Sequence, residues 1–116
     1  MAKRPTLPRI ERVVWGWLDS HPCRRPSVAD MAHPFDLSET QFRRALHKVK
    51  KRPRDVRAFA CMAFAAHLIG DGTKCDAAMA LAGYRNHTNF NKRFFECLGC
   101  RPSDCRGRKT RLLIAS

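Results

Sequence analysis

The stretch GYRNHTNFNKRFFECLGCRPSDCR, residues 83–106, decides the fold that we expect for this chain. After its opening glycine, the hydrophobic residues Phe90, Phe94 and Leu98 recur at every fourth position. This spacing places them on one face of a helix, because an α-helix turns once in about 3.6 residues. Gly99 is expected to end the helix, since glycine adopts the left-handed conformation of a helix C-cap without a steric penalty. The opposite face carries Asn, His, Thr, Lys and Arg, so it is predicted to face solvent or a partner.

The same unit occurs earlier in the chain, which reveals an internal repeat. Four positions correspond at an offset of 47, namely Val28, Met31, Asp36 and Leu37 with Cys75, Ala78, Gly83 and Tyr84. Two correspond at an offset of 48, Phe42 and Leu46 with Phe90 and Phe94, and Pro53 corresponds to Pro102 at 49. Each copy is predicted to be a short helix, a tight turn and a longer helix. Two copies of one supersecondary unit in a chain indicate a duplicated architecture.

Hydrophobic spacing and capping residues predict the other helices. An amphipathic helix is indicated by Ile10, Val13, Val14, Trp17 and Leu18. Ser27 is expected to cap the first short helix, and Ser38 the longer helix that follows, because a serine side chain accepts a hydrogen bond from a free N–H of the first turn. The core face of that longer helix is predicted to consist of Phe42, Leu46 and Val49.

Residues 54–69 are predicted to form one long helix between the two copies. Its middle, residues 58–66, has no charge on any side, and a helix that is apolar all round is expected to be buried. We therefore predict an all-α fold of about seven helices, in which two helix-turn-helix subdomains are joined by this long central helix. The expected boundaries are a basic arm (1–8), the first subdomain (9–53), the connecting helix (54–70), the second subdomain (71–107) and a basic tail (108–116).

Charge is the feature of the composition that bears most on function. Lys and Arg number 23 against 10 Asp and Glu, which gives a net charge of +13. The positive charge gathers in residues 38–57 and 85–111, with a nearly neutral connector between them. Such an excess favours a polyanionic partner, with nucleic acid as the default. No apolar run approaches the ~20 residues of a membrane span, so no membrane association is expected.

The six cysteines and the acidic residues bear on the competing functions. We expect no export signal and therefore a cytoplasmic protein with reduced thiols. The spacing of Cys97, Cys100 and Cys105 leaves a structural zinc site open, with Cys75 or His87 as the fourth ligand, and it also leaves thiol redox sensing open. Our prediction is that Cys100 and Cys105 are small buried hydrophobes and that the protein binds no metal or other cofactor. Because no catalytic constellation is apparent, we do not expect an enzyme.

Three motifs carry a resemblance to a known family. The first unit contributes Ser27, Val28, Met31, Ala32, Asp36 and Ser38, the connector contributes Ala65, Leu68 and Ile69, and the second unit contributes Gly83, Tyr84, Phe90, Phe94, Gly99, Pro102 and Arg106. In their spacing the chain resembles the DNA-binding domain of AraC/XylS-type bacterial transcription regulators, from about Ile10 to Arg106. It is similar to the short stand-alone activators of that family. Asp36, where the family has a turn glycine, and Cys105, where it has an aromatic residue, depart from the pattern.

The resemblance implies a function and a mode of binding. It implies a monomer that inserts two recognition helices into successive major grooves of double-stranded DNA, bends the DNA, and activates transcription by contacting RNA polymerase. Two alternatives remain open: an architectural or repressor protein on the same scaffold, and a metal- or thiol-responsive regulator.

The resemblance also implies which residues contact DNA. Matched by motif position, the predicted base-reading residues are Thr40, Gln41, Arg43, Arg44, His47, His87, Thr88, Asn91 and Lys92. Arginine suits guanine and asparagine suits adenine, because each side chain makes two hydrogen bonds to that base. The predicted phosphate-binding residues are Ser38, Lys48, Lys50, Lys51, Arg52, Arg85, Asn89, Arg93 and Arg106, which would supply affinity rather than sequence choice.

Overall fold

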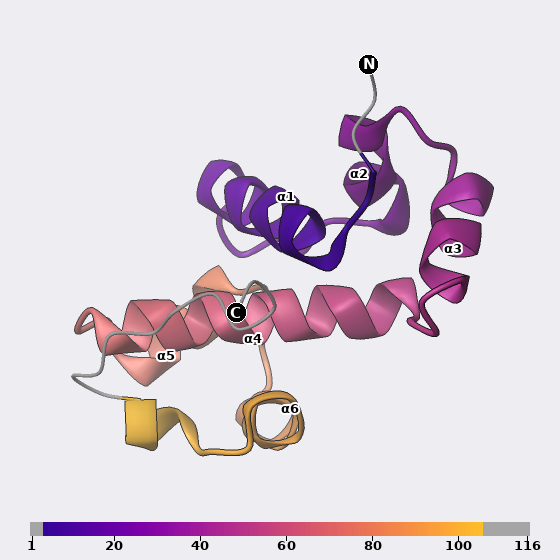
Figure 1. Cartoon of the computed structure of the whole chain (residues 1–116). Coiled ribbons are helices and arrows are strands. Elements are labelled where there is room, and N and C mark those ends of the chain that lie inside the picture. Colours follow the sequence, from indigo (N-terminus) through magenta and orange to yellow (C-terminus); the bar gives the residue numbers. More distant parts are fainter. Residues whose placement is uncertain (1–3, 106–116) are drawn as a thin grey trace.

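Helices make up all the regular structure of the described part of the chain. A computed structural model describes residues 4–105, and within them there are six α-helices, two 3₁₀ helices and no strand (Figure 1). The α-helices are α1 (Leu7–Ser20), α2 (Val28–Ala32), α3 (Glu39–His47), α4 (Pro53–Gly70), α5 (Cys75–Leu81) and α6 (His87–Leu98). The 3₁₀ helices are η1 (His33–Phe35) and η2 (Pro102–Cys105). The predicted all-α class is confirmed, with six α-helices in place of about seven.

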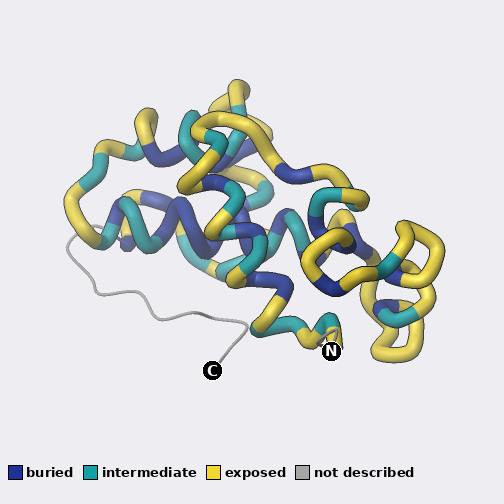
Figure 2. The backbone as a smooth tube through the Cα atoms, turned by 90° about the horizontal axis from the view of Figure 1, so that it is seen from above, coloured by how far each residue is buried: buried dark blue, intermediate teal, exposed yellow. Residues whose placement is uncertain are grey.

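Helix α4 runs through the middle of the molecule, and most of the other elements pack on it. It contacts α1, α5, α6 and η2, and Figure 1 shows it between α1 above and α6 below. Of the uncharged residues 58–66, which were predicted to be buried, all are buried except Phe59, which is half-buried (Figure 2). Although α4 is the longest helix, neither it nor any other helix within residues 4–105 has the apolar length to cross a membrane.

The interface between α1 and α4 holds the two halves of the chain together. Ile10, Val14 and Leu18 of α1 are completely or almost completely buried, as their helical spacing predicted. Trp15 lies beside this stripe, where its indole N–H donates to the carbonyl of Ala60 at 3.1 Å and its ring meets the edge of Phe64. Glu11 is also fully buried in α1, which the hydrophobic pattern did not predict.

The two turns between a short and a longer helix have the same backbone geometry. In the first turn, the N–H of Asp36 donates to the carbonyl of His33 (3.0 Å), and the next N–H donates to that of Ala32 (3.4 Å). In the second turn, the N–H of Gly83 donates to the carbonyl of Ala80 (3.0 Å), and the N–H of Tyr84 donates to that of Met79 (3.1 Å). Both central residues are left-handed, with φ of 57° and 87°. The chain ends α3 at Lys50 and α4 at Gly72 with the same pair of hydrogen bonds and a positive φ, so this turn is the common helix ending of the molecule, and the two units at an offset of 47 share it.

Side-chain caps fix where the helices begin. Ser27 and Ser38 start α2 and α3 with complete capping boxes, in which the side chains of Asp30 and Gln41 accept from the N–H of each serine. Asn86 starts α6 by accepting the N–H of Asn89 at 3.0 Å. The sequence allowed Asn86 or Thr88 as this cap, and the structure has Asn86. Gly99 ends α6 in the left-handed conformation, as predicted.

Of the predicted core positions, Val49 is exposed, and Val13, Trp17 and Leu98 are only partly buried against the core. Phe42 and Leu46 of α3 are buried, as are Phe90 and Phe94, their equivalents in α6. Val49 is 56% exposed, so its assignment to the core was wrong. The reason is that α3 ends at His47 and the chain then leaves the helical path, with Lys50 in the left-handed region at φ 57°.

Candidate nucleic-acid interface

The outer face of α3 is polar and basic because its inner face is used for packing. Phe42 and Leu46 are buried against the body of the molecule, which turns the intervening positions outward. The predicted base-reading residues of this helix all lie on the exposed side, namely Thr40, Gln41, Arg43, Arg44 and His47. Their donors and cation charges are therefore available to a partner.

Two of the predicted DNA contacts at the start of α3 already have a role in the helix cap. The hydroxyl of Ser38 accepts the N–H of Gln41 at 3.2 Å, and the side-chain oxygen of Gln41 accepts the N–H of Ser38 at 2.9 Å. The amide NH₂ of Gln41 is left to meet a partner. Since the cap orients the first turn, both residues position the exposed face of α3 as well as belonging to it.

The segment after α3 joins it to α4 through a run of exposed cations. Lys48, Lys50, Lys51 and Arg52, all predicted to bind phosphate, are exposed. Arg54 follows them directly in the first turn of α4 and is exposed as well. The positive charge of α3 therefore continues without a break to the start of the central helix.

The outer face of α6 resembles that of α3. The predicted base-reading residues His87, Thr88, Asn91 and Lys92 are exposed, and so are Arg85 and Asn89, which were predicted to bind phosphate. The Nε2 atom of His87 lies 3.6 Å from the Oδ1 atom of Asp76 in α5, with both side chains well exposed. A DNA contact by His87 therefore competes with this carboxylate.

Arg93 differs from the other predicted phosphate-binding residues because it joins helices. It is half-buried, and its guanidinium lies 3.6 Å from Asp55 of α4 and 3.3 Å from Glu96 of its own helix. The pair with Asp55 connects α6 to α4, so Arg93 helps to position α6. Arg106, also predicted to bind phosphate, lies outside the described residues.

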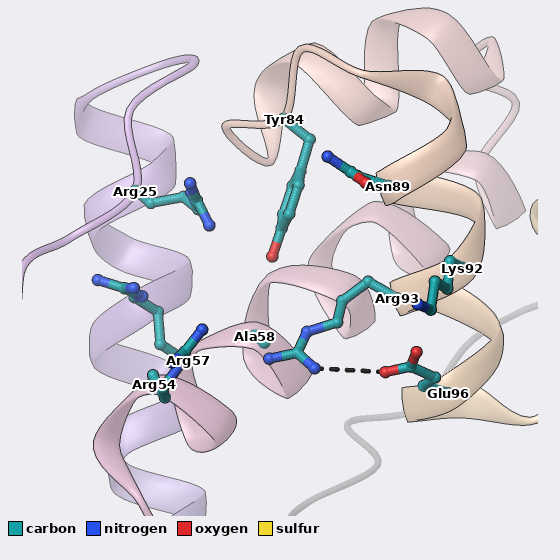
Figure 3. A pocket seen from close by; sticks show the side chains of 9 residues that line it. All are labelled: Arg25, Arg54, Arg57, Ala58, Tyr84, Asn89, Lys92, Arg93 and Glu96. Carbon is teal, nitrogen blue, oxygen red and sulfur yellow. Dashed lines mark hydrogen bonds and ion pairs between the residues drawn. The ribbon is translucent and has the colours of Figure 1, made fainter.

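A cleft between α4 and α6, which we call the basic cleft, brings three cations without a predicted role, Arg25, Arg54 and Arg57, together with the predicted DNA contacts Lys92 and Arg93. It has a volume of about 350 Å³. Its lining includes Arg25, Arg54, Arg57, Lys92 and Arg93, together with Ala58, Tyr84, Asn89 and Glu96 (Figure 3). Arg54 and Arg57 stand at the end of the basic zone of residues 38–57, so charge alone could have drawn attention to them. Only the fold brings Arg25, which precedes α2, to the same place.

Phe95 was also missed, and it lies on the outer face of α6. Its side chain is 57% exposed, whereas the neighbouring Phe94 is fully buried. Helical spacing could have revealed it, because Phe95 falls one position off the stripe of Phe90, Phe94 and Leu98. Together with Asn91 and Lys92 it borders a second cleft that reaches η2. The outer face of α6 is therefore partly apolar.

Helices α3 and α6 have different orientations. In Figure 1, α6 is viewed along its axis, whereas α3 is viewed from the side. In the same view α3 lies beside the first turns of α4, and α6 lies below the middle of that helix. Their axes are therefore not parallel, and they lie at different points along α4.

The cysteines do not gather around one point. No group of three or more His, Cys, Asp or Glu residues within residues 4–105 has an arrangement that could hold a metal ion. The sulfur atoms of Cys100 and Cys105 lie 3.8 Å apart. Cys61 is buried in α4, and this burial raises the pKa of its thiol to about 12. That thiol therefore stays protonated at neutral pH.

No known family model, no curated protein and no solved structure matches this chain. The similarity to the AraC/XylS type consequently remains a prediction from the motifs.

Proposed function

We propose that the protein is a sequence-specific DNA-binding transcription regulator of the AraC/XylS type. In this proposal α2–α3 and α5–α6 are helix-turn-helix units, and α4 is the helix that joins them. The observation that carries it is the repeated layout: a short helix, a tight turn and a longer helix occur twice, and each longer helix has aromatic residues inside and polar, basic residues outside. That is the layout in which a second helix enters a major groove.

The two outer faces supply complementary kinds of DNA contact. In α3, the exposed Arg43 and Arg44 can each donate two hydrogen bonds to guanine, and in α6 Asn91 can pair with adenine in the same way. Phe95 adds an apolar group that suits the methyl group of thymine. The cations of residues 48–52 contact phosphates, which fixes the register of the protein on the duplex.

One duplex receives both helices. The positive charge runs from α3 through residues 48–52 to Arg54 and Arg57, and these border the same cleft as Lys92 and Arg93 of α6. The longest dimension of the molecule is 39 Å, slightly more than the roughly 34 Å between successive major grooves on one side of DNA. A monomer of this size would cover little more than one turn of DNA.

The bound duplex is bent. Two parallel helices could enter successive grooves of straight DNA by a simple shift along its axis, but α3 and α6 are not parallel. Bending by 40–90° costs DNA on the order of 1–6 kcal/mol, which further phosphate contacts offset. We propose that the bent complex activates transcription by contacting RNA polymerase.

The test is selection of bound sequences from a random DNA library, followed by salt titrations with the selected and a scrambled duplex. The expected result is one recurring sequence bound at least about a thousandfold more tightly than the scrambled duplex. Equal affinity for both duplexes in physiological salt would contradict the proposal and favour the architectural alternative. A gel-shift assay with the site at different positions in the fragment measures the bend, and unbent DNA would contradict simultaneous insertion of α3 and α6.

A pair of variants separates base reading from phosphate binding. We expect Arg43→Ala to cost about 1–3 kcal/mol and to relax preference at one or two base pairs. Lys48→Ala, the matched control from the adjacent loop, should weaken all sequences equally and reduce the salt dependence by about one unit of slope. An equal loss on all sequences for Arg43→Ala would reassign this arginine to phosphate binding.

Thiol-responsive regulation is a second candidate, favoured by the 3.8 Å between the sulfur atoms of Cys100 and Cys105. A peroxide would oxidise the two thiols to a disulfide, with their two hydrogens leaving in water. The test compares DNA affinity and thiol content before and after peroxide treatment, with Cys100→Ser as the control. An unchanged affinity of the oxidised protein would eliminate this candidate.

A further inference from the structure

The basic cleft is assembled from parts that are far apart in the chain. Arg25 comes from the loop before α2, Arg54 and Arg57 from the first turns of α4, and Lys92 and Arg93 from α6. In Figure 3 the side chains of Arg25 and Arg93 extend into the space between these elements, and the hydroxyl of Tyr84 points into it as well. Only the tertiary structure brings these cations together.

The carboxylates that line or border the cleft leave most of its charge uncompensated. Five cationic side chains line it, against the single carboxylate of Glu96. Within residues 4–105, the ion pairs made by these cations are those of Arg93 with Asp55 and Glu96. Arg57 donates one hydrogen bond to the carbonyl of Pro26 at 3.1 Å, which fixes the position of its guanidinium. The uncompensated positive charge around the cleft favours a multivalent anion as its ligand.

Neutral hydrogen-bond donors complete the lining. Tyr84 lies under the guanidinium of Arg25, which is 4.6 Å from the centre of its ring. Burial raises the pKa of Tyr84 from its usual value of 10.0, so its hydroxyl keeps its proton and can donate at neutral pH. The amide of Asn89 lies beside this ring (Figure 3). The cleft therefore offers planar guanidinium groups, an ammonium group, a phenol and an amide to one ligand.

We propose that the basic cleft is a binding site for a phosphoryl group. Guanidinium groups favour phosphate, since their two parallel N–H donors match two of its oxygens. The group has two possible sources, a backbone phosphate of bound DNA or a free phosphorylated small molecule. If the phosphate belongs to DNA, the inference rests on the proposed function, because the cleft would then contact the DNA strand between the two inserted helices. If the phosphate belongs to a small molecule, the inference is independent of that function.

The first experiment measures binding of inorganic pyrophosphate by calorimetry without DNA. The cleft variant Arg25→Gln/Arg54→Gln removes two of the five cations and leaves the Arg57 hydrogen bond to Pro26 in place. The control variant Arg9→Gln/Arg12→Gln removes the same charge from the exposed side of α1. We expect the cleft variant to lose at least about tenfold in affinity, and the control less than about threefold.

The second experiment measures the affinity of both variants for duplex DNA. A loss with the cleft variant that exceeds that of the control, together with competition between pyrophosphate and DNA, identifies a backbone phosphate as the ligand. A selective loss of pyrophosphate affinity with equal DNA affinities identifies a free phosphorylated molecule. Sequence preference in the selected DNA is a separate measurement, so the regulator proposal can fail while the cleft proposal stands.

Equal behaviour of the cleft and control variants in both experiments would overturn the proposal, because the cleft would then act only as general surface charge. Thermal unfolding of each variant checks that it folds. Should the double cleft variant unfold, Arg54→Gln alone replaces it, with Arg12→Gln as its control. Arg54 is exposed, and we expect this single change to lower affinity by about threefold or more.

Discussion

The two helix pairs of this protein have the same turn geometry but tolerate different side chains in it. Asp36 and Gly83 are equivalent, and both are left-handed. The first turn demands only this conformation, which aspartate adopts more readily than most residues. The second turn also demands space, because a Cβ atom on Gly83 would lie 2.5 Å from the Cγ atom and 3.1 Å from the backbone nitrogen of Arg25. The two turns therefore share a backbone shape, while the contact with Arg25 restricts which residue the second turn accepts.

The two longer helices are also held differently. Helix α6 packs on α4 and is tied to it by the pair of Arg93 and Asp55. Helix α3 packs chiefly on α2, with the rings of Phe35 and Phe42 stacked at 6.3 Å. The orientation of α6 is therefore set by the central helix, and that of α3 by its own helix pair. In the proposed complex with bent DNA, we expect α3 to adjust more than α6.

The largest expected effect comes from the two neighbouring phenylalanines of α6. Phe94→Ala removes a fully buried ring and should lower the free energy of unfolding by about 3–5 kcal/mol. Phe95→Ala removes an exposed ring and should change it by less than about 0.5 kcal/mol, while weakening DNA binding. Urea unfolding followed by circular dichroism measures both. Similar losses of stability for the two variants would contradict the described packing of α6.

The second comparison tests the space around the turn glycine. Gly83→Ala combines an unfavourable φ with the collision at Arg25, and it should cost about 2–4 kcal/mol. Gly72→Ala is the matched control, because Gly72 has φ 102° with nothing within 4 Å of an added Cβ, so only about 1–2 kcal/mol is expected. Thermal unfolding measures the difference. Equal losses of stability in Gly83→Ala and Gly72→Ala would show that the Arg25 side chain moves aside without a cost in free energy.

A smaller effect is expected from placing glycine in the first turn. Asp36→Gly relieves the left-handed strain but gives the unfolded chain more freedom, and these effects offset to within about 0.5 kcal/mol. The same unfolding assay applies, with Gly83→Ala as the contrasting variant. A loss above about 1 kcal/mol would mean that the Asp36 side chain has a role of its own.

The smallest expected effect is a pH dependence of the stability that the N-terminal cap gives to α2. The equivalent helix α5 has no side-chain cap. The hydrogen bond from the N–H of Ser27 lowers the pKa of Asp30 below 3.8. The cap therefore contributes stability above pH 3.8, and this contribution is lost as the pH falls through the lowered pKa. Between pH 5 and pH 2, the native protein should lose slightly more stability than Asp30→Asn, as measured by urea midpoints. An equal loss in both proteins would contradict this contribution.

Local rules were enough to predict much of the fold from the sequence. Apolar spacing predicted most of the inner faces of α1, α3 and α6, and serine and asparagine predicted the caps of α2, α3 and α6, because both signals arise within one or two turns of helix. The assignment of Val49 failed because the end of α3 depends on how residues 48–52 leave the helix. In the candidate interface, too, local features could be predicted and long-range contacts could not. Polar outer faces were predictable, whereas the pairing of Arg93 with Asp55 was not, since these residues are far apart in the chain.

The sequence by itself determined the helices, their buried faces, the duplicated unit and the excess of positive charge, because each depends on residue type and on spacing of a few positions. Only the tertiary structure decided the different orientations of α3 and α6 and the contact of Arg25 with Gly83. It also decided the gathering of Arg25, Arg54, Arg57, Lys92 and Arg93 around one cleft. The physical reason is that these features depend on how whole helices pack across α4. That packing is set by the shapes of many side chains together.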